Sequence, residues 1–527
     1  MRPALAIATL TLSLAAVLSP GLDAQERRQL PDIGSSAGTV LSPAEQAEYG
    51  AMTLSQLRNY GYVLEDPLLT DWLQSVGRRL GAASDDPQQS YTFFLLGDRQ
   101  INAFATLGGY IAVNAGLVLA ADNEAEVAAV MSHEIAHVTQ EHVLRGVEQA
   151  QRDQVPILLA MLGAIALSQG SNSNSSDDAI MAAVVGAQGL MVQRQIDYTR
   201  SNEAEADRVG IRTLSRSGYD PTAMATFFEQ LQSVVRATDT RETTPGYLQT
   251  HPVTISRISE ARDRARQIEA TSTRGFVPSR NGRDNLLLPS SLRIDAGAGG
   301  GASGEFPWAR ERLRVLTADT PAMAVREYER IARTTALDDA QRYGLALARY
   351  MDGHPSQAAN ELAPLLQAHP GDVWLELAMA QAQARAGKPE EADRILDALL
   401  VRMPRSRPVA LTYAALLNER NTPAAGDRAQ SLLRPLLGSA GADPLFQTTF
   451  ARASEIAGDP VRAGEAYAEA EYLNGRPERA LVQLNTLKKR DDLTYYARAR
   501  IDARIAAITP TVLELQRQGI RDKDLER

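Results

Sequence analysis

The chain has 527 residues, a length that predicts two or three domains rather than a single hydrophobic core. Aromatic residues make up only 5% of the sequence while alanine is abundant, and this composition favours helices over sheets. The formal net charge of -9 argues against a nucleic-acid binder, which would need a basic face to neutralise phosphates. The absence of cysteine excludes disulfides, thiolate metal sites and cysteine catalysis.

Residues 1–24 have the layout of a secretory signal peptide. Arg2 precedes an apolar run from Ala4 to Leu18, and the breaker SPG then ends this run before a small residue at Ala24. An uncleaved membrane anchor is the alternative, although the run is shorter than the roughly 20 residues that span a bilayer. An exported protein of this size without cysteine fits the bacterial periplasm, because a large core makes disulfides unnecessary.

The next segment predicts a helix and then short strands. The pair Ser42-Pro43 is typical of a helix start. The apolar segments Tyr91–Asp98 and Tyr110–Val118 are predicted to be strands on either side of the sequence INAFATLGG.

A long helix that carries a metal-binding motif is predicted after these strands. Asp122 or Asn123 can cap its N-terminus. The sequence HEIAH places His133 and His137 four residues apart, so both imidazoles leave one helix face and can reach one zinc ion. Glu134 is the candidate base that would take the proton of an attacking water. HExxH on a helix is the signature of zinc peptidases.

A catalytic zinc needs a third protein ligand, and the histidine nearest in sequence is a poor candidate. His142 lies about 140° around the helix from His137, so we expect its side chain to be solvated. The longer motif HExxHxxGxxH is absent, because Gln140 and Val143 occupy the glycine and last histidine positions. The sequence therefore excludes the metzincin arrangement.

Glu203 is the better candidate for the third ligand. It shares a helix face with Asp207, whereas Glu205 points roughly 200° away. Asp207 would accept a hydrogen bond from the outer nitrogen of a ligating histidine and so fix its tautomer. From the spacing alone, a solvated acidic face is an equally good interpretation of Glu203 and Asp207.

Two apolar stretches, Val155–Leu167 and Ala179–Val192, lie on either side of the polar sequence SQGSNSNSSDD. With 13 and 14 residues, each is too short to span a membrane. We predict a helical hairpin that packs on the core. The weaker alternative is a mobile flap or a peripheral contact with a membrane surface.

The C-terminal part of the sequence repeats every 34 residues. The pattern Pro-x-x-Ala recurs at Pro321–Ala324, Pro355–Ala358 and Pro389–Ala392, and a fourth copy begins at Pro423. An alanine-rich, helix-turn-helix unit of this length is typical of tetratricopeptide repeats. The Gly-, Ser- and Arg-rich residues 268–304 are predicted to link these repeats to the preceding domain.

The motif HEIAH, preceded by NEAEVAAVMS and followed by EAEAD, resembles the gluzincin metallopeptidases related to the CAAX-prenyl protease and the heat-shock membrane protease. LPDIGSSAG, INAFATLGGYIAVNAGLV, LQTHPVTISRI and the repeats match, in order, the exported β-barrel assembly-enhancing proteases of that group. The resemblance supports Glu203 as a ligand. It implies a mainly α fold, with a zincin-like metallopeptidase domain of helices and a small edge-strand sheet at 25–267. An α-solenoid of tetratricopeptide repeats at 305–527 follows.

The resemblance also assigns roles that the residues alone do not. It implies an edge strand along which an extended substrate can pair. The residues of this strand are Asn102, Ala103, Phe104, Gly108, Gly109 and Tyr110. Thr106 and Leu107 replace the Leu-Pro that the family usually has, so the loop at the two glycines departs from the pattern. His251, an ordinary surface histidine on spacing alone, matches a family histidine that is either a fourth metal ligand or a stabiliser of the oxyanion.

The implied activity is that of an endopeptidase with one Zn²⁺ per chain. It would act in the periplasm in the assembly and quality control of outer-membrane β-barrel proteins, degrading misfolded or stalled ones. The alternative is a chaperone-like assembly factor that binds the β-barrel assembly machinery through its repeats, with latent proteolysis. The expected partners are unfolded or misassembled outer-membrane proteins and this machinery, without nucleic acid and without a transmembrane span in the mature chain. A membrane-bound processing peptidase is a third, weaker alternative, which requires residues 1–24 to stay uncleaved.

Overall fold

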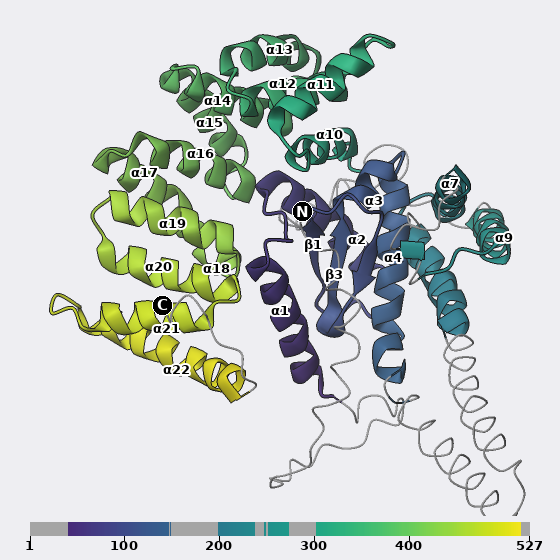
Figure 1. The fold of residues 1–527 in the computed structure, drawn as a ribbon, viewed down its shortest axis with the longest axis horizontal. Helices are drawn as coiled ribbons and strands as arrows, with labels where there is room; N and C mark the ends of the chain where they lie inside the picture. The colour runs from purple at the N-terminus through teal and green to yellow at the C-terminus, as the bar shows by residue number, and fades with distance from the viewer. Residues whose placement is uncertain are drawn as a thin grey trace, which may run out of the picture.

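The structure is a computed structural model that describes residues 41–146, 148, 199–237, 247–248, 251–272 and 302–517. Helices dominate these ranges, and they hold one three-stranded sheet, in agreement with the predicted fold class. Figure 1 shows the sheet among its helices and, beside them, a curved array of helices that forms the C-terminal part. Within these ranges every helix falls short of the length and apolar character that a membrane crossing requires.

The sheet has the strand order β1-β3-β2, with β1 at Thr92–Leu96, β2 at Ala103–Ala105 and β3 at Tyr110–Asn114. β1 runs parallel to β3 and β2 runs antiparallel to it. β3 ends at Asn114 because the apolar residues Ala115–Ala120 form helix α3, so the predicted strand Tyr110–Val118 was too long. A short apolar run without a clear period does not separate strand from helix.

The predicted substrate strand is also shorter than the resemblance implied. Of the residues predicted for this strand, only Ala103 and Phe104 belong to β2. The other predicted residues were Asn102, Gly108, Gly109 and Tyr110. Gly108 and Gly109 lie in the 3-10 turn η3 (Leu107–Gly109), and Tyr110 begins the central strand β3. Both glycines have a positive φ, and a Cβ on Gly108 would lie 2.6 Å from the Cα of Ala47. The tight turn and its packing therefore require these glycines.

The helices of the peptidase part pack on the sheet and on one another. They are α1 (Pro43–Asn59), α2 (Pro67–Ala82), α3, α4 (Glu124–Thr139), a helix at residues 199–216, α7 (Ala223–Ala237) and α9 (Ile255–Ser272). The first four contact the sheet, whereas α7 packs against α4 and α9 packs against α7. Ser42 caps α1 in a capping box with Glu45, and Asn123 caps α4 by accepting a hydrogen bond from the backbone N–H of Glu126. Both predicted helix starts are thus confirmed. Because small and apolar residues occur all round α4, the helix is buried against α2, α7, β2 and β3.

The C-terminal helices form the predicted solenoid. They are α10 (Phe306–Leu316), α11 (Pro321–Ala332), α12 (Asp339–Met351), α13 (Pro355–Ala368), α14 (Val373–Arg385), α15 (Pro389–Arg402), α16 (Arg407–Arg420), α17 (Pro423–Leu433), η6 (Arg434–Leu436), α18 (Leu437–Ala440), α19 (Pro444–Ile456), α20 (Pro460–Leu473), α21 (Pro477–Lys488) and α22 (Tyr495–Arg517). The four repeated prolines are the first residues of α11, α13, α15 and α17. A backbone N–H at the first helical position has no hydrogen-bond partner within the helix, so proline, which lacks this group, is tolerated there. The 34-residue period is therefore a structural period.

The solenoid packs onto the peptidase part. Arg312 on α10 donates hydrogen bonds of 2.9 and 2.6 Å to the two carboxylate oxygens of Asp66, the N-cap of α2, and both side chains are buried. The ring of Phe306 lies 6.2 Å from that of Trp72 on α2. Figure 1 shows the green and yellow helices curving around α1. The two parts consequently share one hydrophobic core.

The buried carboxylate of Glu124, the first residue of α4, joins three segments at this junction. It accepts hydrogen bonds from Trp72 Nε1 (3.0 Å) and from the Tyr219 hydroxyl (2.9 Å). Ser303 donates to it from its backbone N–H (2.8 Å) and from its hydroxyl. The first described residues of the C-terminal part therefore meet the N-terminus of α4.

Several predictions fall outside the described residues. These are the signal peptide at 1–24, the apolar stretches Val155–Leu167 and Ala179–Val192, and most of the linker at 268–304. At both ends, residues of the predicted linker belong to ordered structure. α9 continues to Ser272, and Ser303 contacts Glu124. The side chain of Glu124 is distant in sequence, so the polar composition of this segment gave no indication of that contact.

Candidate metal centre

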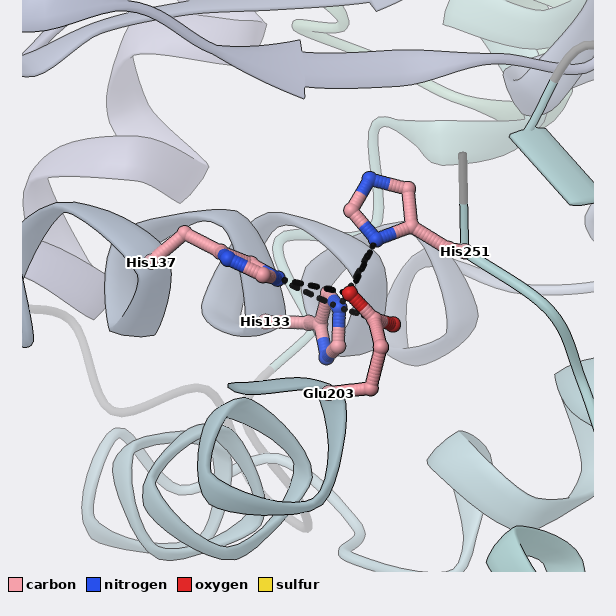
Figure 2. A group of neighbouring side chains, drawn as sticks. All are labelled: His133, His137, Glu203 and His251. Carbon is pink, nitrogen blue, oxygen red and sulfur yellow. Dashed lines mark hydrogen bonds and ion pairs between the residues drawn. The ribbon is translucent and has the colours of Figure 1, made fainter. Parts of the chain in front are cut away.

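Four side chains converge beside the buried helix α4 (Figure 2). His133 and His137 extend from one face of α4, and their Nε2 atoms are 3.0 Å apart. Glu203 places its carboxylate oxygens 3.4 Å from Nε2 of His133 and 3.3 Å from Nε2 of His137. Nδ1 of His251 lies 2.8 Å from the same carboxylate. One ligand atom from each of the four lies within 4.8 Å of the others, so together they can hold one metal ion.

The outer nitrogens of the two helix histidines fit this interpretation. Nδ1 of His133 lies 3.0 Å from Oδ1 of Asp207, and Nδ1 of His137 lies 2.9 Å from Nδ1 of His142. Because each Nδ1 is engaged outside the cluster, each Nε2 can direct a lone pair at a shared centre. Imidazole nitrogens and a carboxylate around one point form a donor set for a divalent transition metal.

Gly210 allows the helix that carries Glu203 to approach α4. A Cβ on Gly210 would lie only 3.1 Å from the backbone N and Cα of His133 and from the carbonyl oxygen of Ser132. Glu203, Asp207 and Gly210 follow one another at helical spacing and share a face. This close crossing therefore brings both carboxylates to His133.

Asp207 lies beside Nδ1 of His133, and Arg257 on α9 holds it there. Arg257 donates from Nε (2.7 Å) and Nη2 (2.8 Å) to the two oxygens of Asp207, while its Nη1 lies 2.8 Å from Oε2 of Glu203. Burial raises the pKa of Asp207, but the hydrogen bonds from His133 and Arg257 outweigh it and hold the pKa below its usual value. An ionised Asp207 can thus fix the Nδ1–H of His133.

Glu134 lies between the ligand cluster and the edge of the sheet. Its Oε2 accepts a hydrogen bond of 3.0 Å from the backbone N–H of Ala105, and its Oε1 lies 3.7 Å from Nε2 of His251. The backbone groups of Asn102 and Thr106 bond to β3, so the backbone of Ala105 faces away from β3, as alternation along a strand requires. The carboxylate therefore borders the side of β2 that points away from the sheet.

His251 belongs to the site rather than to the surface. Its ring is buried and stacks on Tyr247, with centroids 4.8 Å apart and an interplanar angle of 28°. Its backbone N–H donates a 2.7 Å hydrogen bond to the carbonyl of Tyr247. The ring lies between two carboxylates, since Nδ1 faces Glu203 and Nε2 faces Glu134.

His142 contradicts the prediction of a solvated side chain. It is buried, with Nδ1 against His137 and Nε2 3.1 Å from Oε2 of Glu205. The helical geometry failed because α4 ends at Thr139 and Glu141 adopts a left-handed conformation, with φ of 53°, before residues 142–146 resume a helix. Burial, followed by the proximity of His137, lowers the pKa of His142 to about 4.

Comparisons with known proteins bear on the family of this chain. The chain matches the family model described as Peptidase family M48 over residues 67–265 and a model described as Tetratricopeptide repeat over residues 349–416. It is 32% identical to the beta-barrel assembly-enhancing protease of Yersinia pestis, over 95% of this chain and 96% of the relative. The chain belongs to the β-barrel assembly-enhancing protease family.

Other members and more distant relatives are consistent with this family. The beta-barrel assembly-enhancing protease of Escherichia coli (strain K12) is 32% identical over 90% of both chains. Metalloprotease LoiP of the same organism is 30% identical over 36% of this chain and 69% of its own length. The protein is therefore a metallopeptidase with tetratricopeptide repeats, as the sequence predicted.

Sequence reasoning missed Arg257, and it wrongly expected His142, which lies behind His137, to be solvated. Arg257 lies in the quoted sequence LQTHPVTISRI, in which only the histidine was singled out. A buried position for an arginine is not visible in sequence, because it depends on the carboxylates that surround it in the fold.

Proposed function

We propose that this protein is a zinc-dependent endopeptidase of the periplasm that acts in outer-membrane β-barrel assembly and degrades misfolded or stalled barrel proteins. The name of the relatives, beta-barrel assembly-enhancing protease, supports the process. The layout of residues 1–24 and the absence of cysteine support the compartment. The activity rests above all on the position of Glu134, between the ligand cluster and the outer edge of β2.

In this proposal, His133, His137 and Glu203 hold one zinc ion per chain. Two imidazoles and a carboxylate are a protein ligand set of catalytic zinc sites that leave a coordination position for water. His251 is then either a fourth ligand of a resting state or a donor to the oxyanion during turnover. Its position between Glu203 and Glu134 supports both roles.

When bound, the zinc ion supplies a Lewis acid that polarises the scissile carbonyl and activates water. Glu134 would take one proton from the attacking water as the oxygen of that water bonds to the carbonyl carbon. Glu134 would then pass this proton to the amide nitrogen as the C–N bond breaks, which yields a carboxylic acid and an amine, and the proton of the acid then moves to the amine. Asp207 meanwhile keeps the ring of His133 oriented through its Nδ1–H.

An extended polypeptide is the substrate that the edge of β2 fits best. Pairing with an edge strand uses the main-chain hydrogen-bonding groups of the substrate and few of its side chains. A site of this kind therefore binds segments of many sequences, but only where the segment is unfolded and extended. β2 has only three residues, which suits a short contact centred on the scissile bond. Misfolded or stalled chains present such segments, whereas folded proteins do not.

The test is hydrolysis of casein by the purified mature chain and by its Glu134→Gln variant, with bound zinc quantified in both. We expect cleavage only by the wild type and about one zinc per chain in each protein. The exposed-histidine variant His354→Ala serves as the control and should cleave normally. If neither protein bound zinc, the proposed centre would be wrong. If both bound zinc and neither cleaved, His251→Ala would show whether His251 caps the metal.

We also propose that the solenoid binds the client or the β-barrel assembly machinery, because stacked repeats form an extended concave surface. Complementation of a deletion strain separates this role from proteolysis. If Glu134→Gln restores outer-membrane assembly while degradation stays lost, binding is the primary role. If Glu134→Gln behaves as the deletion does, proteolysis is primary.

A further inference from the structure

His137, the second histidine of the motif, contacts a chain of hydrogen-bonding groups formed by His142 and Glu205. Metal binding by His137 determines which group of each pair donates and which accepts. When Nε2 of His137 binds a metal, the proton of the neutral ring is on Nδ1, so Nδ1 donates. Nδ1 of His142, 2.9 Å away, must then accept. The proton of His142 is consequently on Nε2, which faces Oε2 of Glu205 at 3.1 Å. Each step has a matching donor and acceptor.

The far end of this chain is also held in place. Nη1 of Arg145 donates hydrogen bonds of 3.1 Å both to Oε2 of Glu205 and to the backbone carbonyl of Gln140, which caps the C-terminus of α4. The arginine thus ties the carboxylate to the turn that follows the metal-binding helix. The carboxylate in turn meets the outer edge of the His142 ring.

The backbone before His142 provides an independent observation. Glu141 has a φ of 53°, a conformation that residues with a side chain adopt infrequently and at an energetic cost. A continued α-helix would carry residue 142 about 140° away from His137. The left-handed residue instead brings the His142 ring against His137, with centroids 4.8 Å apart. Unusual backbone conformations persist where the surrounding structure over-determines them, often at functional sites.

We propose that His142 and Glu205 form a relay that fixes the tautomer and the orientation of His137 for metal binding. This inference rests on the metal site proposed above. His142 is a positioning residue, which acts on the metal only through His137. The arrangement parallels the contact of Asp207 with His133 but differs in charge, because a neutral imidazole lies behind His137 where a carboxylate lies behind His133. The relay therefore orients His137 without placing a second negative charge directly behind the ligands.

The test compares near-isosteric replacements in the full-length mature protein. His142→Asn keeps an acceptor oxygen near the position of Nδ1, whereas His142→Leu has a similar size and no acceptor. The measured quantity is the Kd for Zn²⁺ of the metal-stripped proteins, by competition with a chromophoric chelator. We expect about 10–100-fold weaker binding for the Leu variant, the usual effect of losing a partner of a metal ligand, and a Kd close to wild type for the Asn variant. His354→Ala, in the solenoid, should leave the Kd unchanged.

Circular dichroism and thermal unfolding of the metal-free proteins separate folding from metal binding. A Leu variant that melts earlier but binds zinc as tightly as wild type would overturn the proposal, since His142 would then be a packing residue only. If the Leu variant does not fold, Glu205→Met and Glu205→Gln decide, because only glutamine keeps an oxygen for Nε2–H of His142. Equal Kd values for this second pair would also overturn the relay. Failure of the wild-type protein to bind zinc would instead refute the metal site itself.

Discussion

Replacement of Arg257 by methionine tests how the carboxylates of Glu203 and Asp207 are held in the metal-free protein. Arg257 is buried, donates two hydrogen bonds to Asp207 and one to the carbonyl of Pro252, and lies 2.8 Å from Glu203. Methionine has a similar length but neither charge nor donors. The change leaves two buried carboxylates without their cation, and breaking a buried charge pair in this way costs about 3–5 kcal/mol.

The assay is urea unfolding in the presence of a chelator, followed by circular dichroism. With an m-value of about 3 kcal/mol/M, a loss of 3 kcal/mol lowers the unfolding midpoint of the peptidase part by about 1 M. Arg262→Met is the matched control on the same helix, because Arg262 pairs with Glu229 at the exposed surface, and we expect a cost of about 0–1 kcal/mol. Equal midpoints for the two variants would refute the claim that Arg257 holds the buried carboxylates of Asp207 and Glu203 in place.

Three further outcomes are expected. Gly210→Ala should destabilise the metal-free protein, because overpacking against rigid backbone costs about 1–3 kcal/mol. Gly438→Ala is the control and should not destabilise it, because the added Cβ meets open space. Equal melting temperatures for the two variants would contradict the close crossing at His133. Arg312→Met should lower the unfolding midpoint by more than the exposed Arg394→Met, because Asp66 loses a buried partner, and equal shifts would show that this ion pair does not hold the solenoid in place. Chelation should lower the melting temperature, since zinc at 100 times its Kd stabilises the folded state by about 2.7 kcal/mol; identical melting with and without zinc would argue against binding to the folded state.

Local chemistry made much of this molecule predictable. The spacing of His133 and His137 is a property of one helix, and Asn123 caps that helix through its own side chain. The repeated prolines open helices because proline is favoured at the first helical position. In each case a few neighbouring residues decide the outcome, so the sequence carries the information directly.

Features that depend on distant contacts or on one unusual dihedral angle were not predictable. The position of His142 depends on the left-handed conformation of Glu141. Glutamate is not a residue type that indicates a positive φ, so the sequence did not predict this conformation. Arg257 is buried only because Asp207 and Glu203 lie beside it in the fold. The length of β2 is set by pairing with β3 and by the turn at Gly108, whose conformation depends on packing against α1.

The carboxylate of Glu124, which accepts hydrogen bonds from both parts of the chain, affects whether the peptidase part can be studied as a separate fragment. A fragment that ended at residue 267 would lose both Ser303 donors to Glu124 and the Arg312 partner of Asp66, and it would expose Trp72, which Phe306 now covers. Such a fragment would report on a damaged molecule rather than on an independent catalytic module. A force applied at Ser303 would therefore reach the first turn of the helix that carries His133 and His137 directly, through the side chain of Glu124.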